Sequence, residues 1–71
     1  MEKQKNTAAG ATIERGRIAE VVDGGYRVKN LDRPGLISRV ITGMDDTEYK
    51  AEERVYFFMF NDGNGKILCK I

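Results

Sequence analysis

The chain has 71 residues, with 12 basic and 11 acidic side chains, no histidine and one cysteine. This length supports one domain, near the lower size limit for a stable hydrophobic core. The almost neutral charge gives no general attraction to nucleic acid or to anionic membranes. One cysteine without histidine excludes an internal disulfide and argues against a structural zinc site. We therefore expect no metal or other cofactor, and we expect self-association to supplement a small core.

The compartment follows from the same composition. No apolar run reaches the roughly 18–20 residues of a membrane span. The polar segment 1–6 lacks the apolar core of a signal peptide. A single cysteine also fits a reducing environment. The sequence predicts a cytoplasmic protein without membrane association.

Residues 1–10 are small and polar, and they predict a flexible arm before a single domain over residues 11–71. Within the domain, β-branched and aromatic residues form short runs separated by glycine-containing turns, the pattern typical of strands and hairpins. The predicted strands span residues 12–22, 26–31, 36–42, 54–60 and 66–71.

Glycine and proline mark the connections. Asp23-Gly24-Gly25 predicts a tight hairpin turn, and Asp62-Gly63-Asn64-Gly65 predicts another. Arg33-Pro34-Gly35 is typical of a type II turn. Gly16 lies inside the first strand, where glycine indicates a bulge or a sharp bend.

Regular alternation is expected in the third and fifth strands. In the fifth strand, Ile67, Cys69 and Ile71 share one face, so the Cys69 thiol is expected to be buried and unreactive. In the third strand, alternation places Leu36, Ser38 and Val40 on one face. It places Ile37, Arg39 and Ile41 on the other.

Residues 43–53 break the β pattern. Asp45 and Glu48 have the spacing of a capping box, which predicts a single helical turn. An acidic loop without a helix fits the same residues equally well. Both alternatives place a polar connection between the third and fourth strands.

Five short strands with mostly tight turns cannot bury an apolar face in a flat sheet. They predict an all-β fold, a small five-stranded barrel that is OB-like or SH3-like. A helical turn between the third and fourth strands would favour the OB-like variant.

The fourth strand, residues 54–60, is apolar on both faces. Its odd-numbered side chains share one face, whereas Tyr56, Phe58 and Phe60 share the other. A barrel has one interior, so the second face must be covered by residues 43–53, by the arm, or by another protein. We expect Tyr56, Phe58 and Phe60 to form an interface with a protein partner or a second copy.

Basic residues of the first half support an alternative, a barrel that binds single-stranded nucleic acid. OB-type barrels bind single strands through a sheet face with basic and aromatic side chains. Here Tyr26 would supply a stacking ring, and the basic side chains would be Arg17, Arg27, Lys29 and Arg39.

Catalysis is not expected from this composition. Nucleophilic catalysis needs a nucleophile beside a base, but Ser38 is the single serine and histidine is absent. The acidic pairs Asp45-Asp46 and Glu52-Glu53 lie in a polar segment, and sequence neighbours diverge in space.

A longer series of motifs resembles a known group of proteins. The series is Gly16-Arg17-Ile18, an acidic turn at Asp23, Tyr26-Arg27-Val28, residues 36–40, Tyr49 followed by Glu53-Arg54-Val55, and Asp62-Gly63-Asn64-Gly65-Lys66-Ile67. It resembles the small OB-like barrel modules of phage and prophage tail, baseplate and spike proteins, over about residues 16–71. One position departs from the pattern, since Glu52 stands where those modules usually carry glycine. The resemblance implies a non-enzymatic role in building a phage-like particle.

Overall fold

A computed structural model describes residues 12–71 of the chain. The predicted arm, residues 1–10, lies outside the described residues. In the described part all regular secondary structure is β-strand. The strands are β1 (Ile13–Val22), β2 (Gly25–Asn30), β3 (Thr42–Gly43), β4 (Arg54–Met59) and β5 (Gly65–Lys70).

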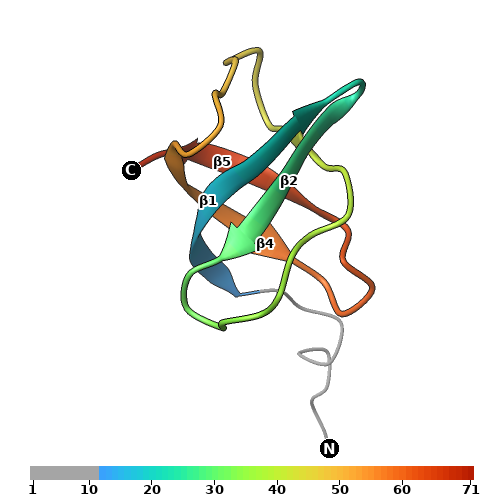
Figure 1. The fold of residues 1–71 in the computed structure, drawn as a ribbon, viewed down its shortest axis with the longest axis vertical. Coiled ribbons are helices and arrows are strands. Elements are labelled where there is room, and N and C mark those ends of the chain that lie inside the picture. The colour runs from blue at the N-terminus through green and yellow to red at the C-terminus, as the bar shows by residue number, and fades with distance from the viewer. Residues whose placement is uncertain (1–11) are drawn as a thin grey trace, which may run out of the picture.

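The five strands form one sheet in the order β2-β1-β4-β5-β3, in which only the β3–β5 pairing is parallel. Isolated antiparallel bridges join Tyr26 to Ile41 and Lys29 to Ile37. These bridges tie β2 to the chain that precedes β3, so the sheet curls into a half-barrel (Figure 1). The prediction of a small all-β barrel is confirmed.

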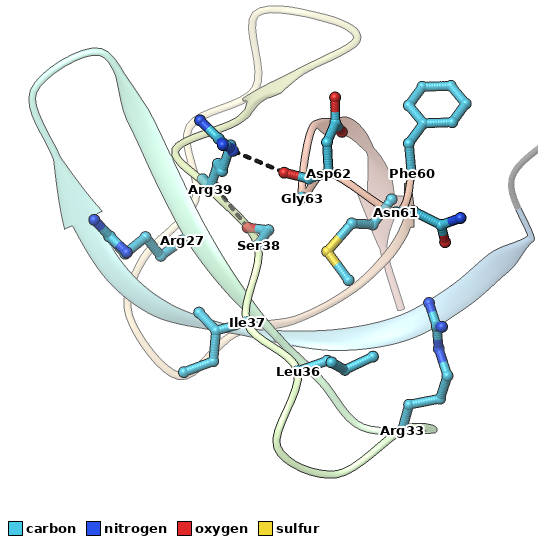
Figure 2. Close-up of a pocket in the computed structure, with 11 residues that line it drawn as sticks. Arg27, Arg33, Leu36, Ile37, Ser38, Arg39, Phe60, Asn61, Asp62 and Gly63 are labelled. Atoms are coloured by element: carbon cyan, nitrogen blue, oxygen red, sulfur yellow. Dashed lines mark hydrogen bonds between the residues drawn. The ribbon is translucent and has the colours of Figure 1, made fainter.

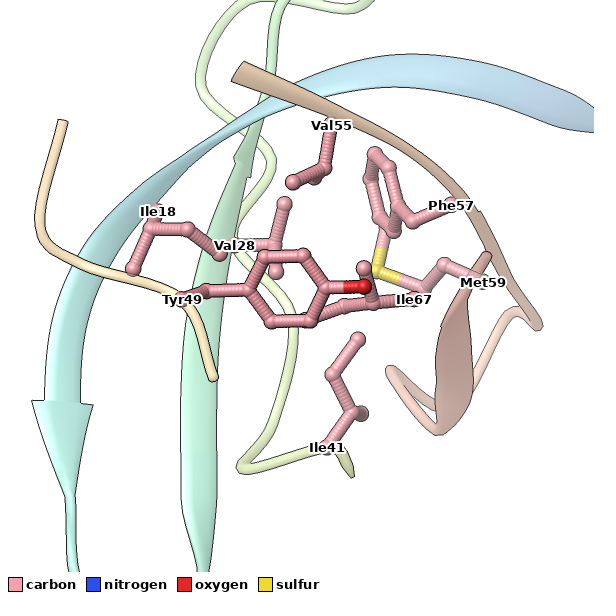
Figure 3. Packing of buried hydrophobic residues seen from close by; sticks show 8 residues of the cluster. All are labelled: Ile18, Val28, Ile41, Tyr49, Val55, Phe57, Met59 and Ile67. Carbon is pink, nitrogen blue, oxygen red and sulfur yellow. The ribbon is translucent and has the colours of Figure 1, made fainter. Parts of the chain in front are cut away.

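The long strands supply to the interior the apolar residues that alternation assigns to their inner faces. In β4 the odd-numbered residues are buried, and β1 and β2 each supply an aliphatic side chain to the same cluster. Figure 3 shows the eight members of this core, Ile18, Val28, Ile41, Tyr49, Val55, Phe57, Met59 and Ile67.

The predicted bulge at Gly16 is misplaced by three residues. Gly16 pairs regularly with Asn30, and the register shifts instead between Ile18 and Glu20. Gly16 is needed for close packing, because a Cβ there would lie 2.4 Å from Val28 Cγ1. Glycine in this strand therefore marks a close approach between layers rather than an extra residue.

The predicted third strand is also corrected. Only Thr42–Gly43 forms regular strand, and residues 36–41 contact β2 irregularly. Ser38 N donates to Val28 O, and Ile41 N donates to Tyr26 O. Three steps along residues 38–41 are thus matched by two steps along β2, which is a bulge. Ser38 and Ile41 both become buried, so the predicted alternation fails here.

The fifth strand carries a second irregularity that overturns the prediction for Cys69. Tyr56 pairs with Cys69 and Phe57 pairs with Ile67, so Leu68 is an extra residue on β5. One extra residue moves every later side chain to the opposite face. Cys69 therefore lies on the outer face beside Tyr56 and is exposed, instead of following Ile67 into the core.

Residues 43–53 form a loop without a helical turn, as the second alternative predicted. The loop directs Tyr49 into the barrel, where its ring packs edge-on against Tyr26 with centroids 5.4 Å apart. Tyr49 N donates to Tyr26 Oη. The loop thereby closes one end of the interior with an aromatic side chain.

The predicted turns are confirmed. Gly24 and Gly63 have a positive φ in the two hairpin turns. Leu36 N donates to Arg33 O across Pro34-Gly35, and Gly35 has φ 90°, as in a type II turn.

Glu52 adopts the left-handed backbone conformation, with φ 75°. Its amide donates to Ile18 O, which fixes the turn into β4. A non-glycine residue in this region carries a steric cost of about 1–2 kcal/mol. The position at which the resembling modules carry glycine is thus a position where the backbone favours glycine.

We predict that Glu52→Gly is more stable than Glu52→Ala by about 1 kcal/mol, because alanine retains the steric cost that glycine removes. Both variants lose the carboxylate that lies 3.7 Å from Arg17, so the comparison isolates the backbone. Urea denaturation measures the difference. An alanine variant of equal or greater stability would contradict the left-handed turn.

We further predict that Tyr49→Phe raises the free energy of unfolding by about 1 kcal/mol. The buried Tyr49 hydroxyl makes no hydrogen bond with the described residues, and an unpartnered buried hydroxyl destabilises the fold by about 1–3 kcal/mol. Burial, followed by the Asp45 carboxylate, raises the pKa of the Tyr49 phenol above its ordinary value of 10.0. The folded state therefore favours the neutral phenol.

The stability that comes from this preference for the neutral phenol is fully present below pH 10. It is lost as the pH rises through the raised pKa of Tyr49. The advantage of Tyr49→Phe over the unchanged protein should consequently grow above pH 10. Tyr56→Phe is the matched control, because the Tyr56 ring is on the outer face. Thermal unfolding across the pH range measures both variants, and equal alkaline losses in all three proteins would disprove the explanation.

Candidate interaction surfaces

The first candidate surface is the outside of the sheet over β1, β4 and β5. Ile13 pairs with Phe58, and Tyr56 pairs with Cys69, so these side chains share one face. The Phe58 and Phe60 rings contact edge-on, with centroids 5.6 Å apart. We define the outer apolar face as Ile13, Tyr56, Phe58, Phe60 and Cys69.

The described residues leave this face largely open. Ile13 is 63% exposed, Phe60 41% and Tyr56 38%, while Phe58 is half-buried. The loop over residues 43–53, one of the predicted covers, instead sends Tyr49 into the interior. A second predicted cover, the arm, lies outside the described residues.

Basic side chains border the outer apolar face. Arg54 lies directly opposite Arg17, whose guanidinium is 3.7 Å from the Glu52 carboxylate. Lys66 pairs with Phe58 and donates to Thr42 Oγ1 at 2.6 Å. Arg17 and Arg54 place like charges opposite each other, and such charges repel. The part of the face beside Arg17 and Arg54 therefore favours contact with an acidic group.

A polar network fixes the loop that follows β2 and carries Arg33. Glu14 is 8% exposed, and its carboxylate accepts hydrogen bonds from Arg33 Nε and Nη2 and from Asn30 Nδ2. Asn30 Oδ1 accepts from the amides of Asp32 and Arg33. Because these bonds satisfy a buried carboxylate and a buried amide, they hold the loop in one position.

A charge pair on the surface reinforces the same loop. Arg15 donates through Nε and Nη2 to Asp32 Oδ1, and through its backbone amide to Asp32 Oδ2. The side-chain hydrogen bonds from Arg15, followed by the bond from its amide, lower the pKa of Asp32. Asp32 is therefore ionised at neutral pH, as the ion pair requires.

The second candidate surface is a groove of about 410 Å³ where the half-barrel is open. It lies between residues 36–39 and the β4–β5 turn, as Figure 2 shows. We define the basic groove by its arginines, its apolar side chains and its carboxylate, which are Arg27, Arg33, Arg39, Leu36, Ile37, Met59, Phe60 and Asp62.

Hydrogen bonds hold the two walls of the basic groove together at one end. Arg39 N donates to Gly63 O, and Arg39 Nε donates to Asp62 O at 2.7 Å. The amide and the side chain of Asn64 both bond the Asp62 carboxylate and lower its pKa, the amide having the larger effect. Arg33 is bonded to the Glu14 carboxylate and Arg27 lies 3.2 Å from the Glu20 carboxylate, so the three guanidinium groups of the groove are matched by the carboxylates of Glu14, Glu20 and Asp62.

The structure brings only part of the predicted nucleic-acid face together. Arg17 and Lys29 are register partners on β1 and β2, and Arg27 and Arg39 line the groove. Tyr26 is not beside them. Tyr26 alternates with the outward-facing Arg27, so the Tyr26 ring packs against the core. Its hydroxyl accepts a hydrogen bond from the Tyr49 amide.

Sequence reasoning missed several members of both surfaces. Ile13 and Cys69 join the outer apolar face through strand register, which the sequence does not display. Arg33 enters the groove because its turn is anchored to Glu14, nineteen positions earlier. The alternation of β1, with Glu14 among inward residues, was a signal that this carboxylate needs a partner.

No group of three histidine, cysteine or acidic residues that could hold a metal is found among residues 12–71. Ser38 is buried, its hydroxyl accepting from Val28 N and donating to Arg39 O. The same described residues include no helix long and apolar enough to cross a membrane.

Comparison with known proteins adds no family assignment. The chain matches no family model and has no significant match to a curated protein.

Proposed function

We propose that this chain is a non-enzymatic structural module that assembles through its outer apolar face. The observation that carries the proposal is the exposed row formed by Ile13, Tyr56 and Phe60 around the half-buried Phe58. Exposed apolar clusters of this kind mark protein interfaces. A core of eight buried apolar residues is small, and association would bury additional apolar surface.

We also propose that the barrel is of the OB type and serves in a phage-like or prophage-type particle. Closure of β2 onto the 37–41 segment gives the cyclic order β1-β2-β3-β5-β4, a partly open Greek-key barrel. The left-handed backbone of Glu52, where the resembling modules carry glycine, supports the same assignment. The particle itself rests on that resemblance.

The assembly proposal predicts that Ile13→Ser combined with Tyr56→Ser converts an oligomer into a monomer. Both side chains are exposed, so their replacement removes apolar contact area while leaving the core intact. Light scattering over a range of concentrations measures the mass. Val21→Ser, at a position 55% exposed elsewhere on the surface, is the matched control and should leave the oligomer unchanged.

Cys69 gives an independent measure of the same interface. Its thiol belongs to the outer apolar face and should react more slowly with a thiol reagent as the protein concentration rises. The Ile13→Ser, Tyr56→Ser variant should react at one rate throughout. A monomer at all concentrations, with constant Cys69 reactivity, would refute assembly through this face.

A second candidate function is single-stranded nucleic-acid binding, which the three arginines of the basic groove favour. OB-type barrels bind ligands at this part of the fold. It predicts that a fluorescent oligothymidine binds at low salt and dissociates as salt rises, because phosphate contacts release counterions. Arg27→Ala together with Lys29→Ala should weaken binding, and anisotropy measures it. Absence of binding at low salt would eliminate this function.

A further inference from the structure

We propose that the outer apolar face binds the acidic segment 44–48 of a second copy of this chain, and that three cations at its edge hold the carboxylates of that segment. The three cations are Lys29, Arg17 and Arg54, which we call the cationic row. The inference rests on the proposed function, because it names the surface with which the outer apolar face associates.

The cationic row crosses three neighbouring strands, β2, β1 and β4 (Figure 1). The register places Arg17 directly opposite Lys29 on one side and directly opposite Arg54 on the other. Each of the three is exposed and is followed by a buried residue, so all three side chains point outward. Side chains placed directly opposite have Cβ atoms about 4.5–5.5 Å apart. The fold therefore holds three positive charges in a line despite their mutual repulsion.

The carboxylates of the same copy do not neutralise the row. Glu52 lies 3.7 Å from Arg17, and its side chain is 75% exposed. Lys29 and Arg54 form no ion pair with any of residues 12–71. Other carboxylates around the row already have a basic partner of their own, in the pairs Glu20–Arg27, Asp32–Arg15 and Glu53–Lys70. Three cations against one exposed carboxylate leave positive charge unmatched, which selects an acidic partner.

The row is continuous with the outer apolar face. Tyr56 is the next outward side chain after Arg54 on β4, and it is 38% exposed. An interface that covers the outer apolar face therefore also covers Arg54 and its neighbours. The partner surface must present carboxylates beside an apolar side chain, because burying the row without carboxylates would leave its charges unpaired.

The unmatched carboxylates of the chain are concentrated at one end of the molecule. Those that are exposed there without an ion pair to the described residues are Asp23, Asp45, Asp46 and Glu48. Segment 44–48 lines a shallow pocket with Gly24 of the β1–β2 turn, and Figure 1 shows the turn and the segment at the same end. Among residues 12–71, Asp62 is the one other acidic side chain outside the ion pairs, and its carboxylate is bonded by Asn64. The chain thus carries its own acidic counterpart to the row.

Segment 44–48 combines these carboxylates with an apolar side chain. Met44 is 62% exposed. Met44 N donates to Ile67 O, and Thr47 N donates to Asp45 Oδ1. Lys50 follows the segment and forms no ion pair with the described residues, so it leaves the three carboxylates unmatched. Because hydrogen bonds already fix the segment, its binding requires little ordering of the chain.

The contact joins different copies. Within one copy, no carboxylate of segment 44–48 forms an ion pair with the cationic row. The row and the segment are unlike surfaces, so each copy offers one of each to its neighbours. Contacts between unlike surfaces arrange copies head to tail and produce closed rings or open filaments.

A single-stranded nucleic acid is the competing anionic partner. The chain has a net charge of +1, so the positive charge of the row is balanced by carboxylates elsewhere on the same molecule. A phosphate backbone would satisfy the row but would leave the acidic end unmatched and would be repelled by it. A second copy satisfies both surfaces at once.

The test uses the full chain and measures its mass by light scattering over a range of concentrations. Self-association should weaken between about 0.05 M and about 0.5 M salt, because part of the contact is ionic. Arg54→Glu should weaken self-association at least about tenfold. Asp46→Asn with Glu48→Gln should weaken it to a similar degree. Arg39→Glu, the same charge change at an exposed position in the basic groove, is the matched control and should associate like the unchanged protein.

Mixing the two defective variants gives the decisive measurement. The Arg54→Glu protein keeps its acidic segment, and the Asp46→Asn, Glu48→Gln protein keeps its cationic row. One intact contact is therefore available between them, and the mixture should form a one-to-one complex, which sedimentation detects. Circular dichroism verifies that each variant is folded.

Three results would overturn the inference. The first is an Arg54→Glu protein that associates as strongly as the Arg39→Glu control, and the second is a mixture that forms no complex. The third is oligothymidine binding that is lost with Arg54→Glu and unaffected by Asp46→Asn with Glu48→Gln, which would assign the row to nucleic acid.

Failure of the proposed function has a different result. If association is lost with Ile13→Ser and Tyr56→Ser but persists with Arg54→Glu, the outer apolar face assembles the chain and segment 44–48 is not its partner. If the unchanged protein is a monomer at every concentration and at both salt levels, the proposed function and this inference are both wrong.

Discussion

The two-sided apolar character of β4 is the constraint on which the rest of the structure depends. β4 lies at the centre of the sheet, between β1 and β5. Its inner residues, Val55, Phe57 and Met59, are buried in the core, and Phe57 approaches Gly16 so closely that β1 tolerates no side chain there. One interior cannot also contain the alternate residues of β4. The same strand therefore stabilises the barrel and leaves aromatic rings on its outside.

Alternation in the sequence predicted the fold wherever the pairing is regular. The period of two assigns the inner residues of β2 and β4 correctly, and the turn residues give the connections. The faces are wrong where one strand carries an extra residue, as at Leu68 and within residues 38–41. A bulge depends on how two distant strands pair, and a single strand's sequence does not contain that information. The exposure of Cys69 follows directly from this effect.

The candidate surfaces were predicted to the same degree. Tyr56, Phe58 and Phe60 could be identified because one strand's own pattern places them together. Ile13 could not, because it joins them only through its register with Phe58. The basic groove could not be identified as a groove either, since it depends on residues 36–39 separating from the β4–β5 turn. The sequence contained its arginines without showing which of them converge.

The irregular segment before β3 connects the fold to its second surface. In a regular strand, backbone groups would continue the ladder with β2, but the Ser38 hydroxyl takes the place of a carbonyl and accepts Val28 N. The resulting bulge turns the Arg39 amide toward Gly63 on the opposite wall. The barrel is consequently joined at one point and open beside it. The opening is lined by three arginines and by one edge of the buried Met59, so the bulge that prevents a complete barrel also produces the basic groove.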